Sequence, residues 1–417
     1  MRLVLQPRWV PRWVPRWAAA CNTGAVSESF DVVIVGGAVI GSAAAFFIAE
    51  AAPRRSRVLV LEADPSYAFC ATTRSLASIR HQFSTPENVR MSMFGTRFLR
   101  EAGERLAVDG VAPLIGFVEA GYLFLASDAG WPVLQSNHAV QRLEGADVAL
   151  LDRAALRERF AWLAVDDLAG GSLGLTGEGW LDAHGLMQGY QRKARALGVE
   201  FRHARAAGLL RDASGITAVR LQGGGLVACG TVINAAGTGA KALASTAGIE
   251  LPVQSRKRCV FHFKSPQATP GCPLVIDPSG LYFRPEGAGF LCGIAPPEDE
   301  DPECYDFEVP AAGFEEQLWP LLARRVPGFE AARLVSSWAG HYDVNLLDHN
   351  LILGAHPEIH NLLFANGFSG HGLQQSPAVG RALSELALHG EFKTLDLRAM
   401  GWQRVLRGEP LRELNVV

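Results

Sequence analysis

A strand, a glycine-rich turn and a helix follow one another after residue 30, and this order constrains the fold more than any other feature of the sequence. Asp31–Val35 ends in four β-branched residues, as expected for a strand buried on both faces. Gly36 to Gly41 form a turn of small residues, and Ser42 to Ala52 have the composition of a helix. Because Arg57 to Leu61 form a second apolar strand, the segment predicts a β-α-β unit within a parallel sheet.

The turn matches the G-x-G-x-x-G pattern of dinucleotide-binding proteins at all but one glycine. Its residues are Gly36, Gly37, Ala38, Val39, Ile40 and Gly41. Ala38 replaces the second glycine, which normally lets the backbone approach a pyrophosphate closely, and one methyl group is compatible with a slightly more distant phosphate. Glu62 ends the next strand 21 residues after Gly41, near the roughly 20 at which an acid binds ribose hydroxyls. The pattern predicts a dinucleotide, NAD or FAD, with its phosphates at the helix N-terminus.

Composition narrows the class of protein. The 417 residues are enough for two domains, and 48% hydrophobic with 19% charged residues is typical of a globular chain. The net charge of −3 gives no basic surface for nucleic acid, and no apolar run is long enough to span a membrane. The seven cysteines form no C-x-x-C pair, so we expect reduced thiols, no metal site and a cytoplasmic location, or the mitochondrial matrix in a eukaryote.

The first 29 residues form a separate segment. Pro-Arg-Trp-Val recurs with proline at positions 7, 11 and 15, and proline at every fourth residue is incompatible with a regular helix. We expect residues 1–29 to be a disordered extension. Adhesion of the Arg/Trp repeat to a membrane surface is the alternative.

Later segments resemble the D-amino-acid oxidase superfamily of FAD-dependent oxidoreductases, which includes monomeric sarcosine oxidase and glycine oxidase. Ala71–Ser75, Asn234–Gly237 and Gly367–Gly372 are similar to its successive flavin-contact segments, and the likeness extends from about Phe30 to Leu388. Gln82–Asn88 and Gly367–Pro377 most resemble a mitochondrial branch linked to the assembly of respiratory complex I.

The resemblance implies FAD as the cofactor. Gly340 occupies the position that carries the covalent flavin link in sarcosine oxidase, so FAD is expected to bind without a covalent bond. Besides the glycine turn and Glu62, the resemblance implies cofactor contacts from Thr72, Thr73, Arg74, Ser75, Ala236, Gly237, Gly370, His371, Gly372, Leu373 and Gln374.

The Gly367–Gly372 segment also has a physical interpretation. Its glycines permit tight turns, and Ser376 with Pro377 is expected to start a helix whose positive end faces the loop. Backbone N–H groups and a helix N-terminus stabilise the negative charge of a reduced flavin. An ordinary turn before a helix is the alternative.

The candidate catalytic residues are two arginines, a tyrosine and a histidine. Ser78–His81 resembles the segment of sarcosine oxidase whose arginine binds the substrate carboxylate, a task that suits the planar guanidinium of Arg80. Arg284 is a second candidate anchor, and Tyr342 and His371 are expected beside the flavin. A solvated or ion-paired arginine is the alternative at each position. Gln374 replaces a carboxylate-binding lysine of sarcosine oxidase, which implies another substrate or a looser hold.

These observations predict an α/β fold with a Rossmann-like FAD-binding domain of the glutathione-reductase type, interleaved with an antiparallel substrate sheet. We expect the FAD-binding domain to comprise residues 30–100, 165–250 and 335–395, and the substrate domain residues 101–164 and 251–334. The expected activity is oxidation of the C–N bond of a small amino acid or secondary amine that is sarcosine-, glycine- or D-amino-acid-like, with oxygen or another electron acceptor. A flavoprotein with an assembly or scaffolding role and an NAD-dependent dehydrogenase are the alternatives.

Overall fold

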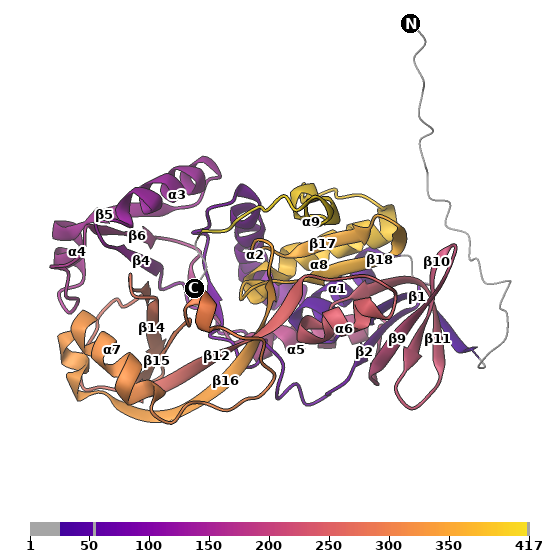
Figure 1. Ribbon diagram of the computed structural model, residues 1–417, viewed down its shortest axis with the longest axis horizontal. Coiled ribbons are helices and arrows are strands. Elements are labelled where there is room, and N and C mark those ends of the chain that lie inside the picture. Colours follow the sequence, from indigo (N-terminus) through magenta and orange to yellow (C-terminus); the bar gives the residue numbers. More distant parts are fainter. Residues whose placement is uncertain (1–25, 53–55, 415–417) are drawn as a thin grey trace, which may run out of the picture.

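The fold contains two large β-sheets, each of eight strands, at the two ends of the long axis of the molecule (Figure 1). The computed structural model describes residues 26–52 and 56–414. A third sheet pairs only two short strands, β3 (Ser78–Ile79) and β7 (Gly179–Trp180). This small sheet lies directly before Arg80, the predicted carboxylate anchor.

The first sheet has the parallel core that the sequence predicts. Its order is β17-β18-β11-β1-β2-β8, with β9 and β10 attached to β11 as an antiparallel hairpin. Neighbours from β18 to β8 are parallel, and β17 is antiparallel to β18. The strands are β1 (Val26–Val35), β2 (Val58–Glu62), β8 (Glu200–His203), β9 (Ala206–Asp212), β10 (Gly215–Leu221), β11 (Leu226–Asn234), β17 (Ile352–His356) and β18 (Ile359–Asn366).

Successive apolar side chains of β1 point to opposite faces of this sheet, and both faces are buried. Val32 and Ile34 belong to the core shared with the helices, whereas Val33 and Val35 belong to the core on the opposite face. The helices of the first face are α1 (Val39–Ala51), α2 (Pro86–Arg105), α5 (Ala183–Ala196) and α8 (Gly372–His389). Gly380 brings α8 close to α1, since a Cβ atom there would lie 2.8 Å from the backbone of Ala43. The two helices whose N-termini are expected to contact the cofactor therefore pack directly together.

The second sheet has the order β16-β12-β15-β14-β13-β4-β6-β5 and is antiparallel except for the parallel pair β13–β4. Phe263, Phe283, Phe290 and Phe329 form an aromatic cluster in its core. Its strands are β4 (Tyr122–Ala126), β5 (Val148–Asp152), β6 (Gly170–Gly174), β12 (Val253–Lys264), β13 (Leu274–Ile276), β14 (Leu281–Glu286), β15 (Gly289–Ile294) and β16 (Arg333–Asn345).

Five further helices and several single turns complete the described part of the chain. The helices are α3 (Trp131–Leu143), α4 (Arg153–Arg159), α6 (Ala240–Ser245), α7 (Trp319–Arg325) and α9 (Trp402–Arg407). The 3-10 turns are Gly237–Gly239, Glu298–Glu300, Pro327–Ala331 and Arg398–Met400, and Gly313–Leu318 is a π-helical turn.

Several element boundaries differ from those predicted. Helix α1 starts at Val39 rather than at Ser42, because the Ser42 N–H already donates to the carbonyl oxygen of Ala38. Strand β1 starts at Val26 rather than at Asp31, because Glu28 and Ser29 pair in parallel with Val227 and Ala228 of β11. The rest of the expected disordered extension, residues 1–25, lies outside the described residues.

Helix α8 starts at Gly372 rather than at Ser376. Gly95 of α2 explains the difference, because it lets the carbonyl oxygen of Gln374 approach to 2.5 Å from the position of a Cβ atom. The first turn of α8 therefore packs on α2, and Pro377 lies inside the helix instead of opening it. The predicted positive end consequently lies directly at His371.

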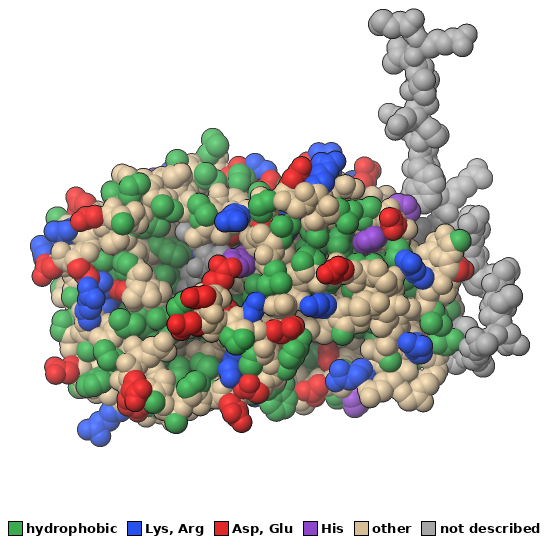
Figure 2. Space-filling model, in the orientation of Figure 1, with side chains coloured by type: hydrophobic (Ala, Val, Ile, Leu, Met, Phe, Trp, Pro, Cys, Tyr) green, Lys and Arg blue, Asp and Glu red, His purple; other side chains and the backbone are tan. Residues whose placement is uncertain are grey.

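The segment bounds expected for the two domains remain a proposal. Sheet membership places β6 and β16 in the second sheet, although residues 165–250 and 335–395 were expected in the first. On the face of the molecule in Figure 2, acidic and basic side chains are interspersed and no basic area dominates.

Candidate functional site

The glycine turn between β1 and α1 is shaped for close backbone contacts. Gly36 has φ of +99°, and a Cβ atom there would lie 2.2 Å from the carbonyl oxygen of Ala235. At Gly41 a Cβ atom would lie 1.8 Å from the carbonyl oxygen of Gly36. Ala38 caps α1 without a side-chain hydrogen bond, so the N-terminus of this helix is left to other partners. The turn therefore fits the anion-binding geometry predicted for it.

Glu62 lies beside this turn at the end of β2. One carboxylate oxygen accepts a hydrogen bond from the Gly37 N–H at 2.7 Å, and the other accepts one from Asp64 at 2.8 Å. A cavity of about 340 Å³ opens next to it, with Tyr67, Gln191 and Arg195 in its wall. The position and size suit the nucleoside half of a dinucleotide.

Residues 72–75 extend from the glycine turn toward the second predicted end of the site. The Val39 N–H donates to Oγ1 of Thr72 at 3.3 Å, and the hydroxyl groups of Thr73 and Ser75 donate to the carbonyl oxygens of Tyr67 and Thr72. Arg74 donates to the carbonyl oxygen of Ala339 at 2.9 Å. Ala236 and Gly237 follow β11, with φ of +52° at Gly237. Hydrogen bonds thus join the 72–75 segment to the start of α1 on one side and to β16 on the other.

The other end of the site is the loop before α8. Asp343 of β16 holds this loop, because its carboxylate accepts from the Gly367 N–H at 2.8 Å and its carbonyl oxygen accepts from the Ser369 N–H at 3.0 Å. Gly370 has φ of +94°, and a Cβ atom there would lie 2.5 Å from the Tyr342 ring. His371 caps α8, and its side chain makes no capping hydrogen bond. Leu373 lies in the first turn of the helix.

A cavity of about 30 Å³ lies at this helix N-terminus. It brings together five predicted residues, Arg80, Tyr342, Gly370, His371 and Gln374. The remaining wall consists of Leu76, Ser78, Tyr122 and Tyr282. The segment from Thr72 to Arg80 therefore connects the glycine turn to this cavity.

Arg80 and His371 meet in this wall. Nη2 of Arg80 lies 3.0 Å from Nε2 of His371, and Nη1 donates to the carbonyl oxygen of Gln82 at 3.3 Å. The Arg80 N–H donates to Oε1 of Gln374 at 2.8 Å. Burial and the Arg80 charge lower the pKa of His371 well below its usual value, so its imidazole is neutral. His371 therefore accepts from Arg80 and adds no positive charge to the cavity.

Arg284 lies apart from the lining of this cavity. Its Nε and Nη2 atoms donate to the carbonyl oxygen of Leu76 at 3.1 and 3.0 Å, and Nη1 donates to Pro285 and pairs with Glu286. These contacts support the wall from behind, and we leave Arg284 out of the site.

Sequence reasoning missed Tyr122, Tyr282 and Glu178. Burial raises the pKa of Tyr122 to about 12 and that of Tyr282 well above its usual value, so both phenols stay protonated at neutral pH. Tyr122 starts strand β4, and Tyr282 precedes Phe283 and Arg284 on β14. Both strands were expected, but the strand pattern does not show which sheet edge each tyrosine reaches.

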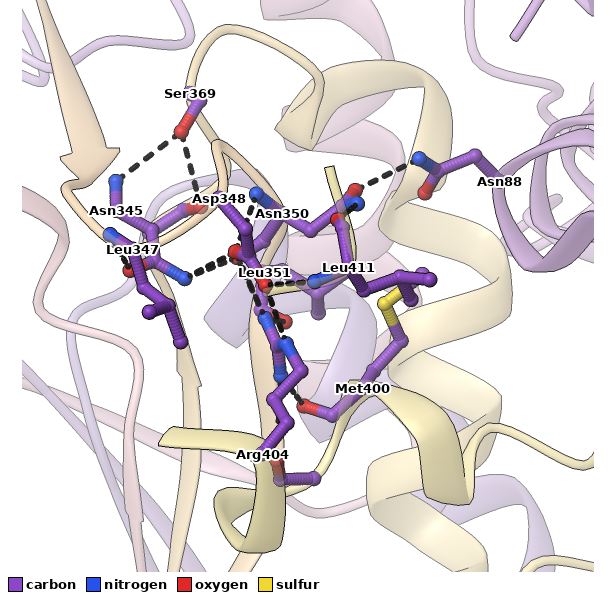
Figure 3. A network of polar contacts seen from close by, with 12 residues as sticks. Asn88, Asn345, Leu347, Asp348, Asn350, Leu351, Ser369, Met400, Arg404 and Leu411 are labelled. Atoms are coloured by element: carbon purple, nitrogen blue, oxygen red, sulfur yellow. Dashed lines mark hydrogen bonds and ion pairs between the residues drawn. The ribbon is translucent and has the colours of Figure 1, made fainter. Parts of the chain in front are cut away.

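A buried polar network supports the Gly367–Gly372 loop from behind (Figure 3). Arg404 of α9 donates to the Asp348 carboxylate at 2.6 Å, and both side chains are almost fully buried. Asp348 also accepts from Asn345 at 2.8 Å, and the Asn345 N–H donates to the Ser369 hydroxyl at 3.1 Å. The segment after α8 thus fixes the loop that borders the cavity.

Comparisons with known proteins agree with this geometry. Residues 31–386 match the DAO family, described as FAD dependent oxidoreductase. FAD-dependent oxidoreductase domain-containing protein 1 of Xenopus laevis is 42% identical over 426 residues, which cover 94% of this chain and 85% of the relative. Glycine oxidase of Geobacillus kaustophilus is 28% identical over 87% of this chain and 93% of its own length.

Solved structures show the same fold. The crystal structure of glycine oxidase from Geobacillus kaustophilus superposes with a TM-score of 0.77 at 25% identity, covering 91% of this chain and 99% of that one. L-proline dehydrogenase from P. horikoshii has a TM-score of 0.80 at 24% identity, covering 92% and 99%. Among residues 26–52 and 56–414, no helix combines the length and hydropathy needed to cross a bilayer.

Proposed function

Because the chain belongs to the DAO family of FAD-dependent oxidoreductases, we propose that it oxidises the C–N bond of a small amine that carries a carboxylate. The observation that carries this proposal is the small cavity at the N-terminus of α8, where Arg80 meets His371 among three tyrosines. An arginine suits a carboxylate, and the cavity of about 30 Å³ leaves room only for a small group.

FAD is the cofactor of this family, and the residues present fit it. We propose that Gly36 to Gly41 and the N-terminus of α1 hold the pyrophosphate, and that Glu62 binds the ribose hydroxyls. Thr72 to Ser75, with Ala236 and Gly237, would line the path between the two ends. The loop at Gly370 to Gln374 would contact the isoalloxazine ring. The glycines at 36 and 41 support this fit, because a side chain at either would collide with backbone.

Bound FAD supplies the acceptor of the hydride that leaves the carbon next to the amine nitrogen. Arg80 would hold the substrate carboxylate so that this carbon faces the ring. The free N–H groups in the first turn of α8 would stabilise negative charge beside them. The tyrosine rings exclude water, and the nitrogen loses its proton as the imine product forms. Hydrolysis of the released imine completes the reaction.

A second candidate is a flavoprotein whose main role is assembly or scaffolding. One observation favours it: the cavity has little free volume. The resemblance to sarcosine oxidase also implies that Gln374 stands where that enzyme has a carboxylate-binding lysine. In this case FAD would stabilise the fold without turnover of an amine.

Anaerobic titration of the purified, FAD-loaded protein separates the two candidates. The panel contains sarcosine, glycine, L-proline and D-alanine, with benzylamine as an amine that lacks a carboxylate. We expect bleaching of the flavin absorbance by at least one carboxylate-bearing amine and slower bleaching by benzylamine. No bleaching across the panel would contradict the oxidation of amines and favour scaffolding.

A further inference from the structure

A glutamate with no place in the proposed reaction is buried behind Arg80. Glu178 lies between β6 and β7 with 1% of its surface exposed. Gly174 makes room for it, because a Cβ atom at position 174 would lie 1.8 Å from Oε2 of Glu178. Gly179 has φ of +152°, and a Cβ atom there would lie 1.9 Å from the carbonyl oxygen of Val118. The loop is thus shaped to insert one carboxylate beneath the Arg80 segment.

Both oxygens of this carboxylate accept hydrogen bonds from the two residues that follow Arg80. Oε1 accepts from the His81 N–H at 2.6 Å, and Oε2 accepts from Nε2 of Gln82 at 2.8 Å. Nε2 of Gln82 also donates to the carbonyl oxygen of Tyr122 at 2.8 Å. Since Arg80 donates to the Gln82 carbonyl, Glu178 fixes the turn from which the guanidinium extends.

A neutral amide of the same shape cannot make this pair of contacts. A glutamine at position 178 would offer one acceptor oxygen, and its NH₂ group would face either the His81 N–H or Nε2 of Gln82, both of which are donors. The charged group that faces the carboxylate is Arg80, and the Tyr122 phenol near it stays protonated. Burial raises the pKa of Glu178 to about 7 in spite of these donors, so the charge of this carboxylate carries a desolvation penalty.

We propose that Glu178 is a positioning residue whose two carboxylate oxygens set the direction of the Arg80 guanidinium and thereby the affinity of the site for carboxylates. The proposal deepens the proposed function, because it rests on Arg80 as the carboxylate anchor. Geometry near a binding group is sensitive: displacement by about 1 Å can lower a rate by about 100-fold.

The test is Glu178→Gln in the FAD-loaded protein. Acetate, a carboxylate that cannot be oxidised as an amine, is titrated while the flavin absorbance is followed, which yields its Kd. Steady-state assays then give KM and kcat for a carboxylate-bearing amine and for benzylamine. We expect Kd for acetate and KM for the carboxylate-bearing amine to rise about tenfold. The kcat of that amine at saturation and the KM of benzylamine should change less than about twofold.

Glu119→Gln is the matched control. Glu119 accepts from the Gly177 N–H of the same loop at 2.7 Å and pairs with Arg100, and its hydrogen bonds go to these partners instead of to the backbone of the Arg80 turn. It should leave Kd for acetate unchanged within about twofold. If Glu178→Gln does not fold, Gly174→Ala displaces the carboxylate while keeping Glu178, and a tenfold loss of acetate affinity is expected there too.

Three results would overturn the proposal. Tighter binding of acetate to Glu178→Gln would indicate that the negative charge of Glu178 lowers the affinity of the site for carboxylates. An equal loss for acetate and benzylamine, or the same loss in Glu119→Gln, would make its role generally structural. An unchanged Kd for acetate in Glu178→Gln would show that Glu178 does not position Arg80. If Glu178→Gln does not fold, an unchanged Kd in Gly174→Ala would show the same. If no amine bleaches the wild-type flavin but acetate binding falls as expected, the proposed oxidation fails while the positioning role stands.

Discussion

The N-termini of α1 and α8 offer two candidate anion sites that are built in different ways. Both begin at residues that give no side-chain cap, Ala38 and His371. The α1 end, which we call the phosphate end, is made by consecutive residues from β1 through Gly41, with Glu62 from the next strand. The α8 end, which we call the ring end, is assembled from β3, β4, β14, β16 and the loop before α8. A contiguous site is encoded locally, whereas an assembled site depends on the whole fold.

The two ends also differ in what stabilises them. The phosphate end relies on glycines that let backbone approach backbone, as at Gly36 and Gly41. The ring end buries ionisable groups, including Arg80, Glu178 and Asp343. Burial raises the pKa of Asp343 to about 6, although the N–H groups of the loop before α8 oppose this shift. Buried charge is costly unless it is paired, so the ring end should be the more sensitive to pH and to loss of a single partner.

The largest effect is expected from Gly41→Ala at the phosphate end. Its Cβ atom would lie 1.8 Å from the carbonyl oxygen of Gly36, so the turn must open. We expect the purified protein to lose nearly all bound flavin, measured as the ratio of absorbance at 450 nm to that at 280 nm. Gly103→Ala in α2 is the control, since its Cβ atom meets nothing closer than 4.0 Å. A yellow Gly41→Ala protein would mean that the turn does not hold the phosphates.

The phosphate end could be predicted from the sequence, and the ring end only in part. The β-branched strand, the glycine spacing and Glu62 are local signals, and the parallel sheet around them is confirmed. Arg80 was proposed from resemblance, and the structure places it with His371. Glu178 and Tyr122 have no local signature, because strand pairing in two different sheets brings them to Arg80. The start of α8 was wrong, since Pro377 is typical of a first helical turn but packing against Gly95 extends the helix backwards.

Arg404→Met tests the network behind the ring end. The Arg404 guanidinium donates to Asp348 and to the carbonyl oxygens of Met400, Asn350 and Leu351. Its loss leaves the buried Asp348 carboxylate without its cation, so we expect the free energy of unfolding to fall by about 3–5 kcal/mol. Urea denaturation measures it. Arg398→Met removes an exposed pair with Asp396 and should change stability by less than about 1 kcal/mol. A similar decrease in the free energy of unfolding of both variants would show that the buried pair stabilises the protein no more than the exposed pair.

The pH dependence of stability gives a smaller effect at the same end. Glu178 has its pKa raised from 4.5 to about 7, so its contribution to stability is complete below pH 4.5 and is lost as the pH rises through 7. Relative to Glu178→Gln, the wild type should lose about 3 kcal/mol between pH 4.5 and pH 8. Denaturation of both proteins at several pH values in this range measures the difference. Glu119→Gln should show the opposite trend, because its Arg100 partner lowers the pKa of Glu119. If the difference in free energy of unfolding between wild type and Glu178→Gln does not change with pH, the pKa of Glu178 is not raised by burial.

Arg80→Lys should affect the ring end and leave the phosphate end unchanged. The expected change in free energy is the smallest of these predictions. Lysine keeps the charge but loses the planar fork, so KM for a carboxylate-bearing amine should rise ~30-fold, or about 2 kcal/mol, while KM for benzylamine changes less than about twofold. The affinity for FAD, measured by ultrafiltration, should stay unchanged, since Arg80→Lys keeps the backbone N–H that donates to Gln374 and leaves the glycine turn unaltered. Arg284→Lys is the matched control: its guanidinium supports Leu76 without lining the cavity, so it should lower thermal stability and leave the selectivity for carboxylates intact. Equal changes in KM for both amines in Arg80→Lys would remove Arg80 from the substrate site. Loss of selectivity in Arg284→Lys alone would indicate that Arg284, and not Arg80, binds the substrate carboxylate.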